Sequence, residues 1–127
     1  MGKLQDELKT YNKIVLDHFE NPRNLGSLAG ATHVVTAENP GCQDLVKMAV
    51  RVEAGRVSDV RVKIMGCTVA IASASMLSEL MRGRNAAELG ALTREALVRS
   101  LGGLPEHKVR CTGGPLAALK KIIDQIA

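Results

Sequence analysis

The spacing of apolar residues predicts helices at both ends of the chain and strands between them. Apolar positions three and four apart run through residues 3–20 and again through 112–126, the spacing that gives a helix one buried face. Between residues 46 and 64, apolar and polar residues alternate in two runs separated by Ala54-Gly55, which is the pattern of a hairpin with a tight turn. We therefore expect an N-terminal helix, a central β-hairpin and a C-terminal helix.

Shorter elements occupy the rest of the sequence. A β-prone run at His33–Thr36 predicts a first strand, and the small-residue segment 68–82 predicts a closely packed helix. Two further short helices are expected at 85–89 and 93–101. This order indicates an α+β fold, a three-stranded antiparallel sheet covered by helices on one face, with the N-terminal and C-terminal helices packed on the body. We expect residues 1–127 to form a single domain.

Composition narrows the possible functions. The chain has 127 residues, of which 46% are hydrophobic, so no metal is needed merely to make it fold. Its net charge is +4, but the basic residues are scattered and the only aromatic residues are Tyr11 and Phe19. Proteins that bind single-stranded nucleic acids rely on aromatic stacking. We therefore expect no nucleic-acid partner, and a mild attraction to acidic proteins instead.

The cysteines indicate reduced thiols in an intracellular protein. No segment has the layout of a signal peptide, and no apolar run approaches the ~18 residues that span a bilayer, so we expect no membrane association. An odd number of cysteines without a signal peptide argues against a disulfide framework. We therefore expect a cytoplasmic protein whose thiols, at Cys42, Cys67 and Cys111, serve another purpose.

These three cysteines lie where predicted elements begin or end. Cys42 precedes the second strand, Cys67 follows the third, and Cys111 precedes the last helix. In an antiparallel hairpin the start of one strand lies beside the end of the other, which places Cys42 and Cys67 at the same end of the sheet. Asp44 adds a carboxylate two residues from Cys42. If Cys111 is packed nearby, three sulfurs and one carboxylate can hold tetrahedral zinc or a small iron–sulfur cluster.

Spacing alone leaves two interpretations of the cysteines open. Cys67 would lie at the start of a helix, where unpaired backbone N–H groups and the helix dipole favour the thiolate that ligates metals. On the other hand, the chain has no C-x-x-C pair, and isolated cysteines are commonly buried as small inert residues. The pattern is equally compatible with ordinary core cysteines.

Four motifs narrow this choice. They are Leu16–Ser27, then Cys42-Gln43-Asp44, then Gly66–Ser75, and finally Leu104–Cys111. In this order they resemble the scaffold proteins of iron–sulfur cluster assembly of the IscU/NifU type, within the IscU/SufU superfamily. The second motif, Cys42-Gln43-Asp44, resembles the family's Cys-Gly-Asp, with Gln43 where glycine is usual. The resemblance extends from about Tyr11 to the C-terminus, so it covers nearly the whole chain.

The resemblance implies a scaffold that builds a transient 2Fe–2S cluster from iron and persulfide sulfur, supplied by a cysteine desulfurase, and transfers it to apo-proteins. Cys42, Asp44, Cys67 and Cys111 would hold the iron or the cluster, and zinc can occupy the same site. Because an oxygen ligand binds iron less covalently than a thiolate, Asp44 would keep the cluster labile. Such a protein is a carrier rather than an enzyme, with sulfur transfer as its one possible activity.

The resemblance also implies individual roles in sulfur transfer. Cys111 would accept persulfide sulfur from the desulfurase. Lys108 matches a family lysine beside that cysteine, and a cation there would favour the thiolate. The sequence is equally compatible with Lys108 as a solvated surface lysine.

One departure from the family pattern favours a second function. Many members have a histidine ligand just before the third cysteine, whereas this chain has Arg110, which stays protonated and cannot coordinate a metal. The ligand set then resembles that of the zinc-binding SufU-like branch, whose members relay persulfide sulfur, although the insertion typical of that branch is missing. A structural zinc site in an adaptor protein is the third interpretation.

Another departure concerns chaperone recruitment. Residues 104–108 read Leu-Pro-Glu-His-Lys, where the version recognised by a dedicated Hsp70-type chaperone reads Leu-Pro-Pro-Val-Lys. This difference puts recruitment of such a chaperone in doubt. His18, interpreted as a packing or capping residue, and His33, a strand residue, are not expected to be ligands. His107 is interpreted as a solvated loop residue, although a loop histidine at this position could also swing towards the site.

Overall fold

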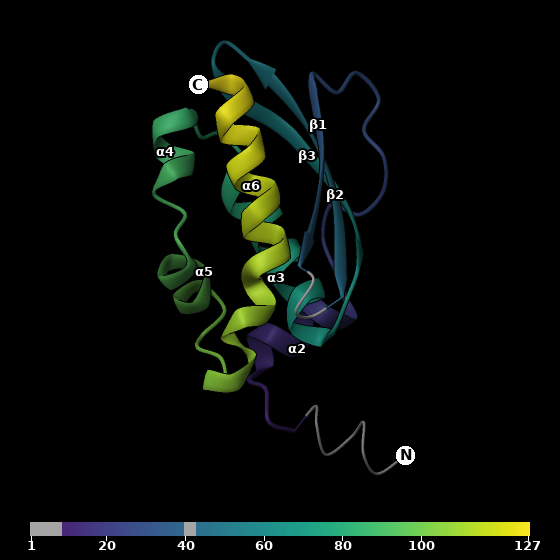
Figure 1. Ribbon diagram of the computed structural model, residues 1–127, viewed down its shortest axis with the longest axis vertical. Coiled ribbons are helices and arrows are strands. Elements are labelled where there is room, and N and C mark those ends of the chain that lie inside the picture. Colours follow the sequence, from purple (N-terminus) through teal and green to yellow (C-terminus); the bar gives the residue numbers. More distant parts are fainter. Residues whose placement is uncertain (1–8, 40–42) are drawn as a thin grey trace.

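The computed structural model describes residues 9–39 and 43–127 and has helices on one side of a three-stranded sheet (Figure 1). The strands pair antiparallel in the order β1-β2-β3. Helix α6 packs against β1 and β2, and α3 packs against β3. This arrangement confirms the predicted α+β fold. The elements are α2 (Lys13–Glu20), β1 (His33–Asn39), β2 (Asp44–Glu53), β3 (Arg56–Met65), α3 (Thr68–Met81), α4 (Ala86–Gly90), α5 (Arg94–Ser100), η1 (Glu106–Thr112) and α6 (Gly113–Ile126).

Strands β2 and β3 form the predicted hairpin. Ala54 and Gly55 have φ angles of 52° and 76°, as the tight turn that suits twisted strands requires. At the other end of the hairpin Leu45 pairs with Met65. The start of β2 therefore lies beside the end of β3, which brings Asp44 next to the segment that leads into α3.

The core lies between the sheet and the helices α3 and α6. The inward positions of the strands alternate with exposed ones, as the sequence pattern predicted. No helix within residues 9–39 and 43–127 is long and apolar enough to cross a membrane. The largest fully buried side chains are aliphatic, as expected for a chain so poor in aromatic residues: Met48, Leu77, Met81, Leu89, Leu97, Leu101, Ile122, Val15, Val46, Val50, Val57 and Val60.

The predicted N-terminal helix is not continuous over its described part. A helix was expected over residues 3–20, but residues 9–12 are not helical and α2 begins at Lys13; residues 1–8 lie outside the described part. Asn12 determines this start, because its backbone is extended and its side chain accepts a hydrogen bond from the Val15 N–H at 3.0 Å. The Asn12 amide also donates to the carbonyls of Leu101 and Gly103, at 2.9 and 3.1 Å. These partners are about ninety residues away, so local spacing could not reveal them.

The end of α2 and the loop that follows it are anchored on α3 by polar contacts. His18 is buried with its Nδ1 at 2.7 Å from Ser75 Oγ, and the same oxygen accepts a hydrogen bond from the Arg23 N–H at 2.9 Å. The Asn24 amide donates to Ser78 Oγ at 2.9 Å. The serines of α3, expected from the sequence only to permit close packing, therefore hold this segment in place. His18 has the packing role that the sequence predicted.

Burial of His18 should make the stability of the fold sensitive to acid. Desolvation, assisted by the nearby Arg23 cation, lowers the pKa of His18 below its ordinary value of 6.5, although Asp17 and Glu79 act in the opposite direction. As the pH falls below about 6.5 the unfolded chain takes up the proton first, so the free energy of unfolding decreases. We expect this decrease in urea titrations between about pH 7 and pH 5.5.

A variant pair tests this assignment. The change His18→Gln should flatten the pH dependence in that interval, whereas the matched change His33→Gln, on the edge strand β1, should preserve it. An unaltered slope in His18→Gln would show that another group is responsible.

Candidate metal and cluster site

The three predicted ligands that the structure describes belong to segments at the end of the sheet where β2 begins and β3 ends. Asp44 is the first residue of β2, and Cys67 is the N-cap of α3. Cys111 is the second-last residue of η1, just before α6. Cys42, the fourth predicted ligand, lies outside the described residues. Within residues 9–39 and 43–127, no three histidine, cysteine or acidic residues are grouped so that they could hold a metal by themselves.

Two glycines bring the starts of α3 and α6 against Asp44. A Cβ atom on Gly66 would lie 2.6 Å from Asp44 Oδ1, and one on Gly114 would lie 3.5 Å from Asp44 Cβ. Neither glycine has a positive φ, so close packing rather than backbone conformation favours glycine, most strongly at position 66. Cys67 follows Gly66 directly and Cys111 precedes Gly114 by three residues, so both cysteine-bearing segments approach the carboxylate.

The Asp44 carboxylate is buried without adequate partners. It is 2% exposed, and neither oxygen has a hydrogen bond of normal geometry from the described residues. Desolvation raises the pKa of Asp44, and the nearby Cys67 backbone N–H, too poorly placed for a normal hydrogen bond, opposes this rise only in part. Leaving a buried polar group unpaired is costly. Free carboxylate oxygens beside thiols suit a bound iron or zinc ion.

The two described thiols differ in access. Cys67 is partly exposed, whereas Cys111 is 4% exposed and belongs to the hydrophobic core. Neither forms a disulfide. Lys108 lies three residues before Cys111 in the 3₁₀-helix η1, and because such a helix has three residues per turn, both lie on the same side of it. Cys111 must therefore leave its buried position before it can react with another protein.

Comparison with known proteins establishes the family. The model of the NifU-like N-terminal domain matches residues 10–125. The chain belongs to this family. It is 39% identical over 113 residues to the iron–sulfur cluster assembly scaffold protein IscU 1 of Archaeoglobus fulgidus, which covers 89% of this chain and 74% of that protein. It is 42% identical over 111 residues to the iron–sulfur cluster assembly scaffold protein IscU of Aquifex aeolicus, and the match covers 86% of this chain and 71% of that protein.

A solved structure supports the fold of this NifU-like domain. The N-terminal part of a nitrogen-fixing NifU-like protein from Brucella abortus matches with a TM-score of 0.79 and 24% identity, over 92% of this chain and 94% of that one. At this level of identity the likeness shows the fold alone. The family that the four motifs indicated is confirmed by the match of the family model over residues 10–125.

Two departures from the NifU-like pattern can be located in the structure. Gln43 has a φ of 55°, in the left-handed region that favours glycine, which explains why glycine suits this position. Arg110 is exposed, and its backbone carbonyl accepts a hydrogen bond from the side-chain amide of Asn39 at 3.0 Å. His107, in η1, is exposed as predicted. Sequence reasoning missed Asn39 and η1, since the contact joins residues 71 positions apart.

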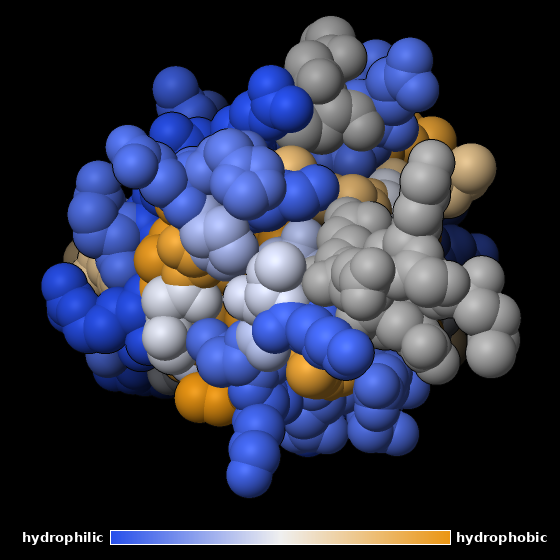
Figure 2. Space-filling view, turned by 90° about the horizontal axis from the view of Figure 1, so that it is seen from below, coloured by the Kyte–Doolittle hydropathy of each residue, from blue (hydrophilic) through white to orange (hydrophobic). Residues whose placement is uncertain are grey.

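The described residues at the end of this NifU-like domain that carries α2 and η1 are mostly hydrophilic. In the view from this end, those that are coloured form only small hydrophobic patches (Figure 2). The exceptions beside the site are Leu45 and Met65, which are 40% and 71% exposed and face each other across β2 and β3. These two side chains form a small exposed apolar pair next to the predicted ligands.

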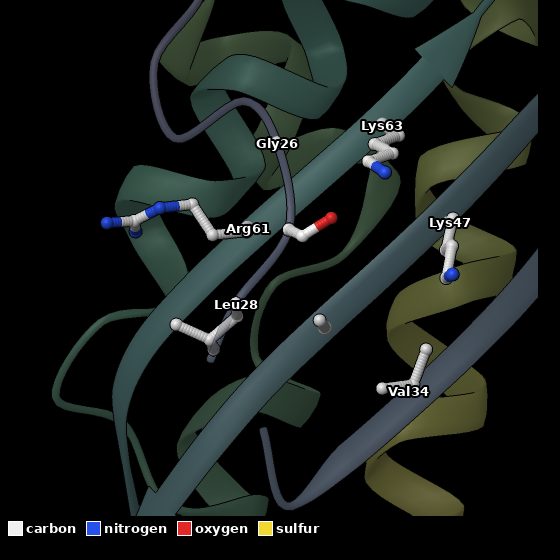
Figure 3. A pocket seen from close by; sticks show the side chains of 8 residues that line it. Gly26, Leu28, Val34, Lys47, Arg61 and Lys63 are labelled. Atoms are coloured by element: carbon white, nitrogen blue, oxygen red, sulfur yellow. The ribbon is translucent and has the colours of Figure 1, made fainter. Parts of the chain in front are cut away.

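A separate pocket of about 110 Å³ lies on the face of the sheet away from the helices (Figure 3). Lys47 and Lys63, which are opposite each other on β2 and β3, line it together with Val34 and the loop that contains Gly26 and Leu28. Its lining contains no cysteine, histidine or carboxylate, so it has no ligands for iron or zinc. The candidate metal site is therefore at the end of the sheet and not in this pocket.

Proposed function

We propose that this NifU-like chain is a scaffold for iron–sulfur cluster assembly. Residues 1–127 act as one cytoplasmic domain that builds a transient 2Fe–2S cluster and passes it to apo-proteins. The observation that carries the proposal is the buried Asp44 carboxylate, whose oxygens lack normal hydrogen bonds from the described residues and lie against Gly66, beside Cys67. The relatives in Archaeoglobus fulgidus and Aquifex aeolicus, which are named as such scaffolds, support it.

In this proposal four side chains hold the cluster. Cys67 and Cys111, with Cys42 from outside the described part, supply thiolate sulfur, and Asp44 supplies oxygen. Thiolates bind iron strongly, whereas a carboxylate oxygen binds it less covalently. One weaker ligand favours release of the cluster, which suits a carrier better than a permanent redox centre.

Sulfur enters through Cys111 in the same proposal. The Cys111 thiolate attacks the outer sulfur of the desulfurase persulfide, a new S–S bond forms, and the desulfurase cysteine departs as a thiolate. Reduction of the bound sulfur to sulfide then takes two electrons from an external reductant. Because Cys111 is buried, η1 must move for the attack to occur, and Lys108 on the same side of η1 would stabilise the thiolate.

Loss of Cys111 should abolish sulfur acceptance. After incubation with a cysteine desulfurase and cysteine, mass spectrometry of the wild type should detect one added sulfur atom on Cys111, and Cys111→Ser should gain none. The matched change Cys67→Ser should keep sulfur acceptance while it loses metal binding. If Cys111→Ser accepts sulfur normally, the assignment of the acceptor is wrong.

The desulfurase would dock beside the site. Leu45 and Met65 offer an exposed apolar contact there, and Lys47 and Lys63 next to them suit acidic side chains on the partner. Recruitment of an Hsp70-type chaperone is not part of the proposal, because Glu106 and His107 replace the residues of the recognised motif.

A zinc-dependent persulfide relay of the SufU-like type is the second candidate. Arg110 favours it, since the histidine ligand of many members is replaced, and three sulfurs with one carboxylate suit tetrahedral zinc. A relay would keep zinc during reconstitution with iron and still accelerate sulfur release by the desulfurase. If removal of zinc merely unfolded the chain, the site would be structural and the protein an adaptor.

A further inference from the structure

Asn39 connects the end of the sheet to the peptide bond that leads into Cys111. As the last residue of β1, Asn39 is the strand partner of Asp44. Its side-chain Nδ2 donates a hydrogen bond to the carbonyl of Arg110 at 3.0 Å. That carbonyl belongs to the peptide unit between Arg110 and Cys111, so the hydrogen bond fixes the orientation of this peptide. One residue therefore contacts the backbone segments of two predicted ligands.

The start of α6 is shaped to accommodate the Asn39 amide. Gly113 has helical dihedral angles, φ −65° and ψ −38°, which alanine adopts without strain. A Cβ atom on Gly113 would nevertheless lie 2.9 Å from Asn39 Nδ2, and one on Gly114 would lie 3.7 Å from Asn39 Cβ. The backbone conformation would accept alanine at position 113, but its methyl group would have to displace the Asn39 amide.

We propose that Asn39 is a positioning residue that fixes Cys111 relative to Asp44. The proposal rests on the proposed function of the site, because it assigns Asn39 a task only if Cys111 and Asp44 are ligands. Metal sites lose affinity when the residues that orient their ligands are removed, typically by 10–100-fold. Asn39 bonds the backbone next to Cys111 and lies opposite Asp44, so it sets the separation of a sulfur and an oxygen ligand.

Titration of the metal-free protein with Co²⁺ tests this role. Thiolate-to-cobalt absorption measures affinity, and the ligand-field bands report the geometry of the bound ion. We expect Asn39→Ala to weaken Co²⁺ binding about tenfold and to change the ligand-field bands, with a cooperative thermal unfolding transition still present. Gly113→Ala should also weaken binding, because its methyl group displaces the Asn39 amide.

A double variant separates positioning from general loss of packing. In Asn39→Ala/Gly113→Ala the atom that the new methyl group would meet is absent. Gly113→Ala should therefore weaken Co²⁺ binding far less in this background than it does in the wild type. Gly90→Ala in α4 is the matched control, because nothing lies within 4 Å of the added Cβ atom, and it should change neither affinity nor spectrum.

Two results would overturn the inference. One is an Asn39→Ala protein with the Co²⁺ affinity and the cobalt spectrum of the wild type. The other is a Gly113→Ala change that weakens Co²⁺ binding equally in the wild type and in Asn39→Ala. Both leave the proposed function intact, since the wild type still binds cobalt through thiolates. If the wild type itself showed no thiolate-to-cobalt absorption, the ligand set would be wrong, and the proposed function and this inference would fall together.

Discussion

Replacing Asp44 with asparagine should stabilise the metal-free protein and weaken its metal binding at the same time. At neutral pH the wild type is destabilised by a buried carboxylate that has no normal hydrogen bonds from the described residues. An unpaired buried polar group costs about 1–3 kcal/mol, and a charged one costs more. Asparagine has nearly the same shape and still leaves polar atoms unpaired, but it carries no charge, so only the extra cost of the charge is removed and the free energy of unfolding should rise by roughly 1 kcal/mol.

The gain should depend on pH in a defined direction. Burial raises the pKa of Asp44 above its ordinary value of 3.8, so the folded protein takes up this proton before the unfolded chain does. Below about pH 3.8 the Asp44 carboxyl is protonated and its burial lowers the free energy of unfolding least. As the pH rises through the folded-state pKa, the carboxyl ionises and the free energy of unfolding of the wild type falls. The advantage of Asp44→Asn should therefore be largest near pH 7 and shrink towards pH 4.

Urea unfolding at these two pH values and Zn²⁺ titration measure both effects. Removal of a residue that merely orients a ligand lowers metal affinity 10–100-fold, so replacing the charged carboxylate ligand with a neutral amide oxygen should lower zinc affinity by about 100-fold. The control Asp124→Asn, on an exposed position of α6, should change neither quantity. A metal-free Asp44→Asn protein that is less stable than the wild type would show that the carboxylate has a partner in the fold.

Gly66→Ala should cause the largest loss of stability among the glycine substitutions considered. The added Cβ atom would lie 2.6 Å from Asp44 Oδ1 and 2.9 Å from the Cβ of Ala70. Ala70 is fully buried and has no flexible side chain that could move away, so the backbone must shift. Overpacking of this kind costs about 1–3 kcal/mol, and we expect a value near the upper end together with weaker metal binding.

Gly90→Ala provides the matched control for that experiment. Position 90 is the last residue of α4, and nothing lies within 4 Å of the added Cβ atom. Alanine is a better helix former than glycine, so this variant should be neutral or stabilised by up to about 1 kcal/mol. A Gly66→Ala protein with the stability of the wild type would contradict the tight packing of Asp44 against the start of α3.

The sequence was most informative where local patterns determine structure. Alternating residues and the Ala54-Gly55 turn predicted the hairpin, whose register then placed Asp44 beside Gly66. The start of α2 was predicted wrongly because Asn12 is held by Leu101 and Gly103. Such contacts between distant residues leave no periodic signal in the chain.

The candidate site was predictable as a set of residues but not in its energetics. The four motifs identified the family, and its expected ligands remain predictions, of which Cys42 lies outside the described residues. The unsatisfied state of Asp44 and the burial of Cys111 depend on three-dimensional packing. The tight packing of Gly66 against Asp44 and Ala70, and of Gly113 against the Asn39 amide, likewise appears only in the structure.

Transfer of an assembled cluster tests the proposed function most directly. The protein is reconstituted anaerobically with iron, cysteine and a cysteine desulfurase, separated from small molecules, and mixed with an apo-ferredoxin while visible circular dichroism is recorded. We predict that a 2Fe–2S chromophore forms on the wild type and then appears on the ferredoxin, and that Cys67→Ser and Cys111→Ser form none. A wild-type protein that retains zinc and forms no chromophore, while sulfur release by the desulfurase accelerates, would contradict the scaffold function.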